Sequence, residues 1–523
     1  MDVTNFFDSH GLSVQSSSGS DKGRCLVARN AVKAGKELFR NAPVACVATK
    51  RGICGVCFKP LLGNINRACS RCKAVQYCST ACQRTDWPRH KLECICLSKT
   101  LPKKVKGNLL LLTRLLRLLH VGGHLLHEST NNTTQELFGL LDRAGPQECS
   151  EILNSLQNHR SLFDSKKLLN LRVIASLAQK ILLEDEVVGE LVGVAGSGTD
   201  SPADAEIDEA KMRTIETGID LLCQAQCNCH TICDEQLTEI GIGLYIAGAC
   251  VNHSCCPSAI VLYDGHTQVF RATRDIAPGD EITISYIDLA QPTGVRRSRL
   301  QKGYFFQCEC QWCLELTARD KARNEMLIEM SRTETDDVAD TATIGAQAVS
   351  GSIATTVSQS RQDGQIENVT TLLREAEKLG RRPCKRTGLS PLELERDKLR
   401  HAFKELDRIG CGTHHFQRIQ AMEMWQSNCL GREDFETAME VSGLLTAALS
   451  KVLDPSSAVL GLQFYKEGKL AWYFTQRERA LDRLRKAAEI LCTTHGSKTH
   501  LVRELLRLCD EARAEKAHFD DDL

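Results

Sequence analysis

The order of apolar and polar positions divides the chain into a strand-rich stretch, two helical stretches and a polar stretch between them. Residues 12–49 alternate in short runs that Ser, Gly and Asp interrupt, which predicts short strands. Residues 95–240 and 369–517 carry apolar side chains at helical spacing, whereas residues 331–367 have no periodicity and are rich in Thr, Ser, Ala, Gln and Asp. The pattern predicts a mixed α+β part, a disordered linker and an all-helical C-terminal part.

The first helical stretch contains three segments with an amphipathic pattern. Residues 109–119 carry Leu at most positions, with two arginines three residues apart on one face, and residues 165–186 and 212–229 form two further helices. Between the last two, residues 192–206 are rich in Gly, Ser, Asp and Ala. This composition predicts a mobile loop inside the helical stretch.

Residues 241–313 bring three motifs close together in the sequence. The polar run Asn252-His253-Ser254-Cys255 follows directly on an apolar run. Residues 280–286 alternate as a half-buried strand does, so that Tyr286, an aromatic hydroxyl, shares the face of two isoleucines. Cys308, Cys310 and Cys313 then form a C-x-C-x2-C cluster. Taken alone, such a stretch is also compatible with a buried hairpin followed by a bare zinc knuckle.

Eight metal-ligand side chains occur at short spacing near the N-terminus. They are Cys54, Cys57, Cys69, Cys72, Cys78, Cys82, His90 and Cys94. The C-x2-C loops place two sulfurs about one ion, and the pairs separated by three residues fit one turn of a helix. Because a structural zinc ion takes four N or S ligands, the eight ligands predict two closed tetrahedral sites.

Composition and charge narrow the class of protein. The 523 residues allow two to four domains, and 66 basic residues balance 66 acidic ones, so no global field favours nucleic acid. The 26 cysteines cluster at metal-ligand spacing, which favours thiolates on zinc in a reducing compartment. We expect no secretion signal, because the N-terminal residues show neither a basic region nor an apolar run, and no membrane span, because the apolar run 108–121 is short and charged. A cytoplasmic and nuclear location is expected.

Residues 241–313 resemble the catalytic core of SET-domain lysine methyltransferases. The resemblance implies that Tyr286 supplies the catalytic hydroxyl and that Asn252 and His253 bind S-adenosylmethionine. It also implies that Cys255 joins the three later cysteines around a third zinc ion. Phe306 is expected to pack against the cofactor and Tyr304 to line the lysine channel.

Two further segments are assigned to the cofactor only because their positions match those of cofactor segments in the SET family. Lys22, Gly23 and Arg24 open a turn into a strand and match the first cofactor segment of the SET family. Asn228 belongs to a Cys-Asn pair like one near the methionine end of the cofactor, although an Asn at a helix end is more often a cap. This chain also departs from the family pattern, with Cys25 in place of a glycine and Cys256 and Ser258 after the polar run.

Residues 54–94 resemble a MYND finger, including the Trp87-Pro88 pair. By that resemblance the two sites interleave, so that the first takes Cys54, Cys57, Cys78 and Cys82 and the second takes Cys69, Cys72, His90 and Cys94. Three zinc ions per chain are therefore expected. Residues 50–94 also hold nine Lys/Arg against two Asp/Glu, which suits weak DNA contact or an acidic peptide, or is a solvated face of a small finger.

The order of segments identifies the chain as similar to the SMYD family of SET and MYND domain protein lysine methyltransferases. In the helical tail, Gly468, Ala480, Leu484 and Ala487 match the offsets of a tetratricopeptide-like helix pair. The fold class expected is α+β and multidomain, with a β-rich SET core divided by a zinc finger and a helical insert. The predicted domains are the first SET part (1–49), MYND finger (50–94), helical insert (95–226), SET core (227–290), post-SET zinc region (291–316), linker (331–367) and TPR-like domain (368–523).

The resemblance implies an enzyme that transfers a methyl group from S-adenosylmethionine to a protein or peptide lysine, histone or non-histone, in the manner of a chromatin regulator. The expected partners are this substrate and peptides bound by the MYND finger, and the expected state is a monomer. The alternative is a catalytically weak, zinc-stapled scaffold or transcriptional co-regulator that recruits partners through the finger and the C-terminal helices. Cofactor binding separates the two, because a scaffold has no need of S-adenosylmethionine.

Overall fold

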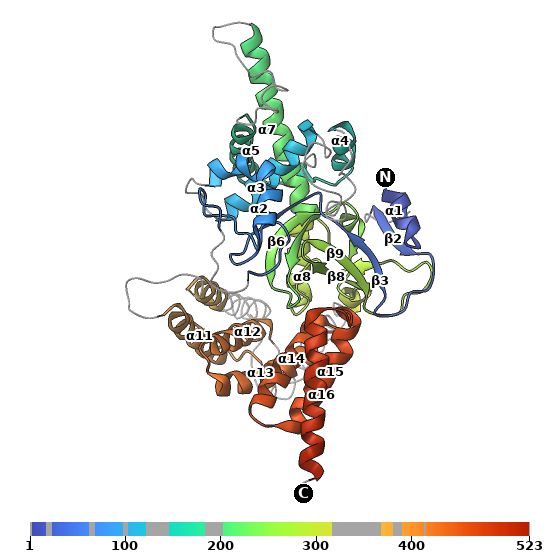
Figure 1. Cartoon of the computed structure of the whole chain (residues 1–523), viewed down its shortest axis with the longest axis vertical. Helices are drawn as coiled ribbons and strands as arrows, with labels where there is room; N and C mark the ends of the chain where they lie inside the picture. Colours follow the sequence, from blue (N-terminus) through green and yellow to red (C-terminus); the bar gives the residue numbers. More distant parts are fainter. Residues whose placement is uncertain are drawn as a thin grey trace, which may run out of the picture. The chain divides into compact units, whose positions relative to one another are not determined.

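The structure is a computed structural model of the chain, and its elements are drawn in Figure 1. It describes residues 3–16, 23–61, 68–97, 103–121, 146–183, 202–315, 368–379, 390–412 and 415–521. These divide into a first compact unit, Met1–Tyr286 with Arg297–Cys308, and a second, Ile287–Arg296 with Glu309–Leu523. The linker predicted at 331–367 lies outside the described residues.

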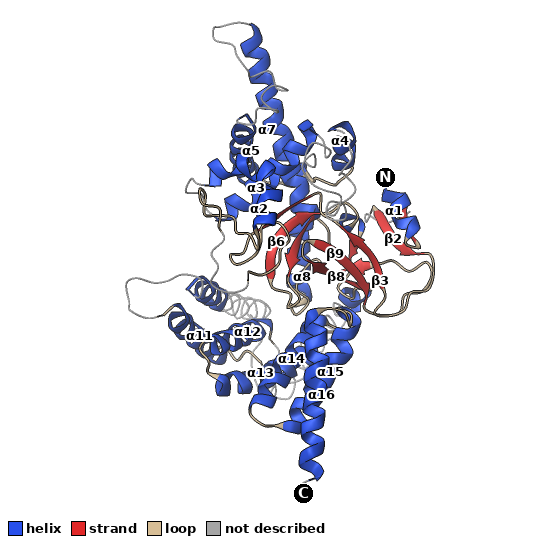
Figure 2. Cartoon of the chain, viewed as in Figure 1, coloured by secondary structure: helices blue, strands red, loops and turns tan. Residues whose placement is uncertain are grey.

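Within the described part of the chain, all strands belong to the first unit. Figure 2 draws these strands in red. Its strands are β1 (Leu12–Ser16), β2 (Arg24–Ala28), β3 (Glu37–Asn41), β4 (Ala45–Ala48), β5 (Cys229–Cys233), β6 (Glu239–Leu244), β7 (Asn252–His253), β8 (Ala259–Asp264), β9 (Thr267–Ala272) and β10 (Thr283–Ile284). Helices occur before, between and after them: α1 (Val3–Ser9), α2 (Thr80–Leu97), α3 (Lys103–Val121), α4 (Pro146–Asn154), α5 (Ser165–Leu183), α7 (Pro202–Asn228) and α8 (Thr293–Tyr304), with the short 3-10 turns η3 (Arg160–Leu162) and η4 (Gly248–Cys250).

The strands form small sheets rather than one continuous sheet. Their orders are β1-β2, β10-β7, β3-β9-β8 and β4-β6-β5. β3 and β9 are antiparallel, and the rings of the opposed residues Phe39 and Phe270 stack with centroids 4.3 Å apart. This pair belongs to a buried core that also includes Leu26, Ile282 and Ile284. The core therefore joins the N-terminal strands to the segment that ends at Tyr286.

The segment predicted as a strand over residues 280–286 is regular only at Thr283–Ile284. The reason is a change of partner along the chain. The N–H of Ile282 donates to the carbonyl of Leu26 at 2.7 Å, and the next two residues pair in parallel with β7. The predicted face is confirmed, because Ile282 and Ile284 are buried and Tyr286 packs against the same core.

The helices predicted before β5 are present and pack around the leucines of α3. This core includes Leu112, Leu115 and Leu116 together with buried residues of α5 and α7. The prediction of a loop over residues 192–206 is wrong at its end, since α7 begins at Pro202. Proline is favoured at the first position of a helix. Its fixed φ suits the helix, and the lack of an N–H costs nothing there, because an N–H at this position has no acceptor within the helix.

Arg114 of α3 differs from the amphipathic pattern, because it is buried rather than solvated. Its Nε donates to Oε1 of Glu93 in α2 at 2.7 Å, and Nη2 donates to Oε2 at 2.9 Å. A third donor, Nη1, reaches the carbonyl of Cys46 in β4. One buried ion pair thus connects the helix of the predicted finger to α3 and to the sheet.

The second unit contains a series of helices, as the C-terminal composition predicts. They are α11 (Pro391–Arg408), α12 (Phe416–Gly431), α13 (Phe435–Val452), α14 (Ala458–Tyr473), α15 (Arg477–Thr494) and α16 (His500–Asp521). The predicted helix pair is confirmed: a Cβ added to Gly468 of α14 would lie 2.9 Å from the side chain of Leu484 in α15. Ala480 and Ala487 of α15 are fully buried. Small residues therefore permit close packing of α14 on α15.

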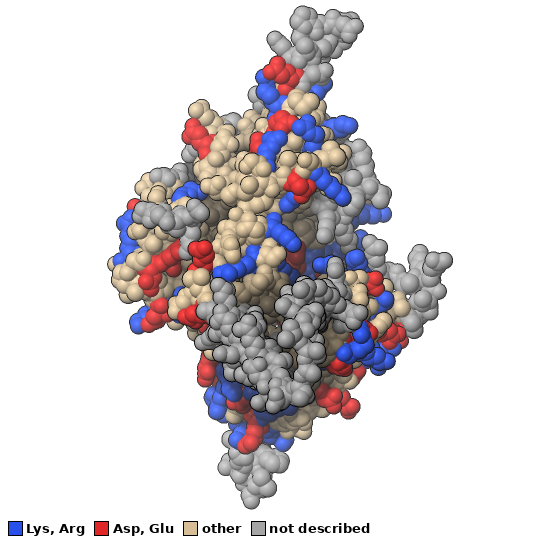
Figure 3. All heavy atoms as spheres, turned by 180° about the vertical axis from the view of Figure 1, so that it is seen from behind, with Lys and Arg blue, Asp and Glu red and all other residues tan. Residues whose placement is uncertain are grey.

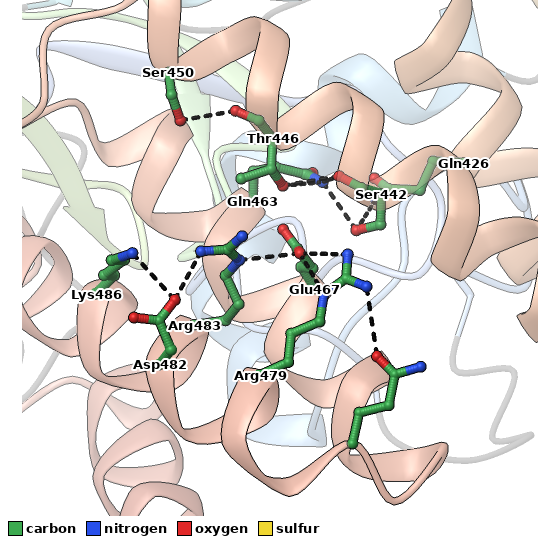
Figure 4. A network of polar contacts seen from close by, with 11 residues as sticks. Gln426, Ser442, Thr446, Ser450, Gln463, Glu467, Arg479, Asp482, Arg483 and Lys486 are labelled. Carbon is green, nitrogen blue, oxygen red and sulfur yellow. Dashed lines mark hydrogen bonds and ion pairs between the residues drawn. The ribbon is translucent and has the colours of Figure 1, made fainter.

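A buried polar network connects α13, α14 and α15 (Figure 4). Oε1 of Glu467 accepts from Nη2 of Arg479 at 2.8 Å and from Nε of Arg483 at 3.0 Å. Beside it, Nε2 of Gln463 donates to the hydroxyls of Ser442 at 3.1 Å and Thr446 at 3.3 Å. These contacts fix the register of three consecutive helices. A shifted register would leave the buried polar groups without hydrogen-bond partners, which costs free energy.

Acidic and basic side chains are interspersed over the face drawn in Figure 3, in keeping with the balanced composition. Among the helices that the structure describes, none has the length and apolar character that crossing a membrane requires.

Candidate active site and zinc centres

The eight ligands predicted near the N-terminus come together as two groups of four. Cys54, Cys57, Cys78 and Cys82 form one group, and Cys69, Cys72, His90 and Cys94 form the other. In each group the ligand atoms lie within 4.8 Å of one another. His90 and Cys94 lie one turn apart in α2, as their spacing predicts. The interleaved pairing is therefore the observed one.

The spacing of the sulfurs fits a tetrahedral zinc ion. With zinc–sulfur bonds of about 2.3 Å, tetrahedral ligands lie about 3.8 Å apart. In the first group the distance from Cys57 Sγ to Cys78 Sγ is 3.6 Å, and in the second the distance from Cys69 Sγ to Cys94 Sγ is 3.7 Å. A hydrogen bond from Cys57 lowers the pKa of the Cys54 thiol, which favours the thiolate form that binds a metal ion.

The helix that carries the finger ligands is held by a buried acidic network. Oδ2 of Asp86 accepts from the hydroxyl of Tyr77 at 2.7 Å, and Oδ1 accepts from Nε of Arg89 at 2.9 Å. Burial raises the pKa of Asp86, but the charges of Arg89 and Arg114 outweigh it and hold the pKa below its ordinary value. Both acids of the finger segment, Asp86 and Glu93, are thus buried in ion pairs.

A third group of ligands forms where the polar run meets the C-x-C-x2-C cluster. It consists of Cys255, Cys308, Cys310 and Cys313. Arg296 of α8 is only 2% exposed, donates from Nη2 to Cys313 Sγ at 3.6 Å, and stacks on Trp312 at 4.4 Å. A four-thiolate zinc site carries a net negative charge, so a buried guanidinium beside it is favourable. The donor set is that of a closed structural zinc site.

Tyr286 lies among aromatic and polar groups that come from separate segments. Its hydroxyl donates to the carbonyl of Val251 at 2.7 Å. Its ring lies 4.8 Å from that of Tyr304 and 5.4 Å from that of His253, and Phe306 lies 6.1 Å from His253. Burial raises the pKa values of the Tyr286 and Tyr304 hydroxyls. The arrangement therefore presents neutral phenols in an apolar setting.

Asn252 connects three segments that are far apart in the sequence. Its Nδ2 donates to the carbonyl of Arg24 in β2 at 2.7 Å and to Oε1 of Glu281 at 2.9 Å. Gly23, just before Arg24, has a φ of 70°, a conformation that glycine adopts at no steric cost. The structure thus brings Gly23, Arg24 and Asn252 together, as the cofactor assignment requires. Lys22 lies outside the described residues.

Asn228 is placed differently from the other predicted cofactor residues. It ends α7, and its Nδ2 donates to the carbonyls of Gln157 and Gln224, each at 2.8 Å. The hydrogen bond to Gln157 holds the end of α7 to the chain before η3, whereas the one to Gln224 lies within α7 itself. Only the side-chain oxygen of Asn228 remains to contact a ligand, and its role in cofactor binding stays a prediction.

Two groups of the site are absent from the sequence-based assignment. Glu281 precedes Ile282, so strand alternation places it on the face away from the core, and nothing in the pattern indicates its contact with Asn252. The second group is the carbonyl of Val251, which accepts from Tyr286. A backbone acceptor has no sequence signal, so only the register of β10 on β7 could reveal it.

Comparisons with known proteins agree with this architecture. The family description "MYND finger" matches residues 54–94. Over 505 residues the chain is 26% identical to histone-lysine N-methyltransferase ASHR1 of Arabidopsis thaliana, covering 95% of each chain. It is 27% identical over 516 residues to histone-lysine N-methyltransferase SMYD3 of Homo sapiens, covering 96% of this chain and 98% of that one. It is 33% identical over 312 residues to N-lysine methyltransferase SMYD2 of Bos taurus, covering 59% of this chain and 61% of that one.

Proposed function

Because the chain belongs to the SMYD family of SET and MYND domain proteins, we propose that it is an S-adenosylmethionine-dependent protein-lysine N-methyltransferase. The observation that carries the proposal is the placement of Tyr286, whose hydroxyl is fixed on the Val251 carbonyl beside Tyr304, His253 and Asn252. The similarity to named lysine methyltransferases over nearly the whole chain supports the same reaction. Histone and non-histone lysines are both compatible substrates.

The residues around Tyr286 suit methyl transfer to an amine. S-adenosylmethionine, when bound, supplies an electrophilic methyl group on a sulfonium. A lysine amine must be neutral to accept it, and deprotonation at pH 7 costs about 4.6 kcal/mol from an ordinary pKa near 10.4. An apolar channel lowers that pKa, because desolvation disfavours the ammonium form. Tyr304 would line the channel and exclude water, and Phe306 would pack against the cofactor.

Tyr286 is proposed to orient the reacting groups through its hydroxyl. Burial raises its pKa above the ordinary value, so the phenolate needed of a general base is disfavoured at neutral pH. A fixed phenol oxygen instead positions the amine for in-line attack, and positioning supplies most of the rate in such reactions. Asn252 and the chain at Gly23–Arg24 are proposed to hold the cofactor.

The three zinc centres have a structural role in this proposal. Each offers four N or S ligands, so no ligand position remains open for substrate. Both acidic residues of the finger are buried in ion pairs, so the charge that the finger exposes is predominantly basic. We propose peptide partners for the finger and weak DNA contact as a secondary property. A monomer in cytoplasm and nucleus completes the proposal.

Radiolabelled methyl transfer tests the activity. The full chain and labelled S-adenosylmethionine are incubated with a cell lysate, and mass spectrometry locates the label in the labelled bands. We expect methyl-lysine in discrete proteins, and no label in a matched lysate whose lysines were acetylated beforehand. Absence of labelled lysine in the untreated lysate would contradict the proposal.

Cofactor binding separates this function from a scaffold. Saturating S-adenosylmethionine should raise the melting temperature, because it binds the native state; at one hundred times Kd the stabilisation is about 2.7 kcal/mol. Asn252→Ala should reduce the shift. A wild-type protein with no shift would favour the scaffold.

A further inference from the structure

His253 uses both ring nitrogens inside the protein. Its Nδ1 lies 3.0 Å from the backbone nitrogen of Tyr286, and its Nε2 lies 3.3 Å from Cys255 Sγ. A backbone N–H can only donate, so Nδ1 must be the acceptor of the Tyr286 hydrogen bond. The proton of the neutral imidazole is then on Nε2, which donates to the sulfur of Cys255. The hydrogen-bond pattern assigns this tautomer.

The sulfur that receives this hydrogen bond belongs to the third zinc group. Cys255 Sγ lies 4.0 Å from Cys308 Sγ, within the spacing expected of ligands on one tetrahedral ion. Imidazole and amide N–H groups that contact ligating atoms fix the orientation of the ligand and tune its affinity for the metal. His253 is therefore an outer neighbour of the zinc centre.

The same run of residues fixes Tyr286 at two points. His253 accepts from its backbone N–H, and Val251 accepts from its hydroxyl at 2.7 Å. β7, which contains His253, also pairs with β10 just before Tyr286. His253 is only 7% exposed, so water does not readily replace either of its hydrogen bonds.

We propose that His253 is a positioning residue that couples metal binding at the third zinc centre to the placement of Tyr286. The inference rests on the proposed methyltransferase activity for its kinetic part and on the zinc centre alone for its metal part. Because both ring nitrogens are engaged, any contact of His253 with the cofactor comes through its backbone. This refines the assignment made from the sequence, which placed His253 among the cofactor residues without distinguishing ring from backbone.

Two substitutions separate the two hydrogen bonds. The amide of Asn reaches the position of Nδ1, so His253→Asn keeps an acceptor for Tyr286 and loses the donor to Cys255. The longer Gln reaches the position of Nε2, so His253→Gln keeps the donor to Cys255 and loses the acceptor for Tyr286. His495→Gln is the matched control, because His495 is also buried, at 2% exposure, and belongs to the second unit.

The experiment compares zinc release and turnover in the full zinc-loaded chain. Zinc release is followed with a coloured chelator, and kcat and the KM for S-adenosylmethionine are measured with a lysine peptide identified from the lysate experiment. His253→Asn should release its most labile zinc about tenfold faster than wild type. His253→Gln should release zinc at nearly the wild-type rate but show about a tenfold lower kcat, with KM changed less than about twofold.

A role in packing alone predicts a different result. Both His253 variants would then lower the melting temperature to a similar degree, as is expected of His495→Gln, and would not have opposite effects on zinc release and kcat. That result, or zinc release from His253→Asn at the wild-type rate, would overturn the coupling. A wild-type protein without methyl transfer would contradict the proposed function, and the zinc-release comparison would still test the contact to Cys255.

Discussion

Polar networks occur both in the candidate site, where Asn252 and Glu281 are partly buried, and in the C-terminal helices, where Glu467 is fully buried, but they are built differently. In the helices, Glu467 accepts from Arg479 and Arg483, which lie one turn apart on the next helix (Figure 4). In the site, the side chain of Asn252 joins the carbonyl of Arg24 to the carboxylate of Glu281, so the contacts span more than two hundred residues of sequence. The first network connects neighbours, and the second connects distant segments.

This difference separates a structural network from a functional one. Neighbouring helices need polar contacts to fix their register, and Glu467 and Gln463 serve that purpose with partners on α13 and α15. The site is assembled where strand pairing joins segments that are far apart in the sequence, and it orders an aromatic hydroxyl among them. Burial of polar groups is therefore weak evidence of function, whereas their convergence from distant segments is stronger evidence.

Removal of zinc should produce the largest contrast between the two regions. Purified protein should contain about three zinc ions per chain, and structural sites contribute roughly 10–16 kcal/mol of folding free energy each. Excess chelator should therefore release the amides of α2 to hydrogen exchange while those of α14 and α15 stay protected. A zinc content of about one or none by elemental analysis would contradict the ligand assignment.

Arg114→Met should strongly destabilise the first unit. The substitution leaves Glu93 buried without its partner, which costs about 3–5 kcal/mol. Urea unfolding measures the change, and Arg213→Met, in an exposed pair with Glu209, is the control with an expected change below about 0.5 kcal/mol. The double substitution Arg114→Met and Glu93→Leu should recover much of the loss. No recovery would show that the pair is not the cause.

Glu467→Gln should weaken the helical network by about 2 kcal/mol, because one oxygen then holds two guanidinium groups without a full charge. Hydrogen exchange of the α14 and α15 amides in the full chain measures the loss. Glu478→Gln, in an exposed pair with Lys516, should change exchange little. Methyl transfer by Glu467→Gln should stay near the wild-type rate, and a large loss of turnover would contradict the separation drawn between the networks.

The smallest expected effect is that of His266 on the pH dependence of the free energy of unfolding. Burial lowers the pKa of His266 to about 4, whereas in the unfolded chain it is near 6.5. Between these two pKa values the unfolded state binds more protons than the folded state. The contribution of His266 to the free energy of unfolding is therefore fully present above about pH 6.5 and is lost as the pH falls. From pH 7 to 5.5 the loss is about 1 kcal/mol. His266→Gln should remove this part of the pH dependence, and an unchanged dependence would contradict it.

The zinc ligands and the helical tail were predictable from the sequence because their determinants are local. C-x2-C spacing and one helical turn give the pairs of finger ligands, whereas the interleaving of these pairs was implied only by the resemblance to a MYND finger. Small residues at fixed offsets give the α14–α15 pair. The change of partner from β2 to β7 within residues 280–286 was not predictable, because alternation indicates a face but not a register. Burial of Arg114 and the contact of Glu281 also depend on tertiary pairing, so periodicity assigned neither.

Tyr286→Phe tests the central claim most directly, because it keeps the ring and deletes only the hydroxyl group that donates to the Val251 carbonyl. Loss of one hydroxyl should change stability by roughly 1 kcal/mol, and the melting-temperature shift with S-adenosylmethionine should remain. Methyl transfer at saturating cofactor and peptide should fall by about two orders of magnitude or more, as when one preorganised polar contact is removed. Turnover within a few-fold of wild type, with cofactor binding intact, would contradict the catalytic role of Tyr286.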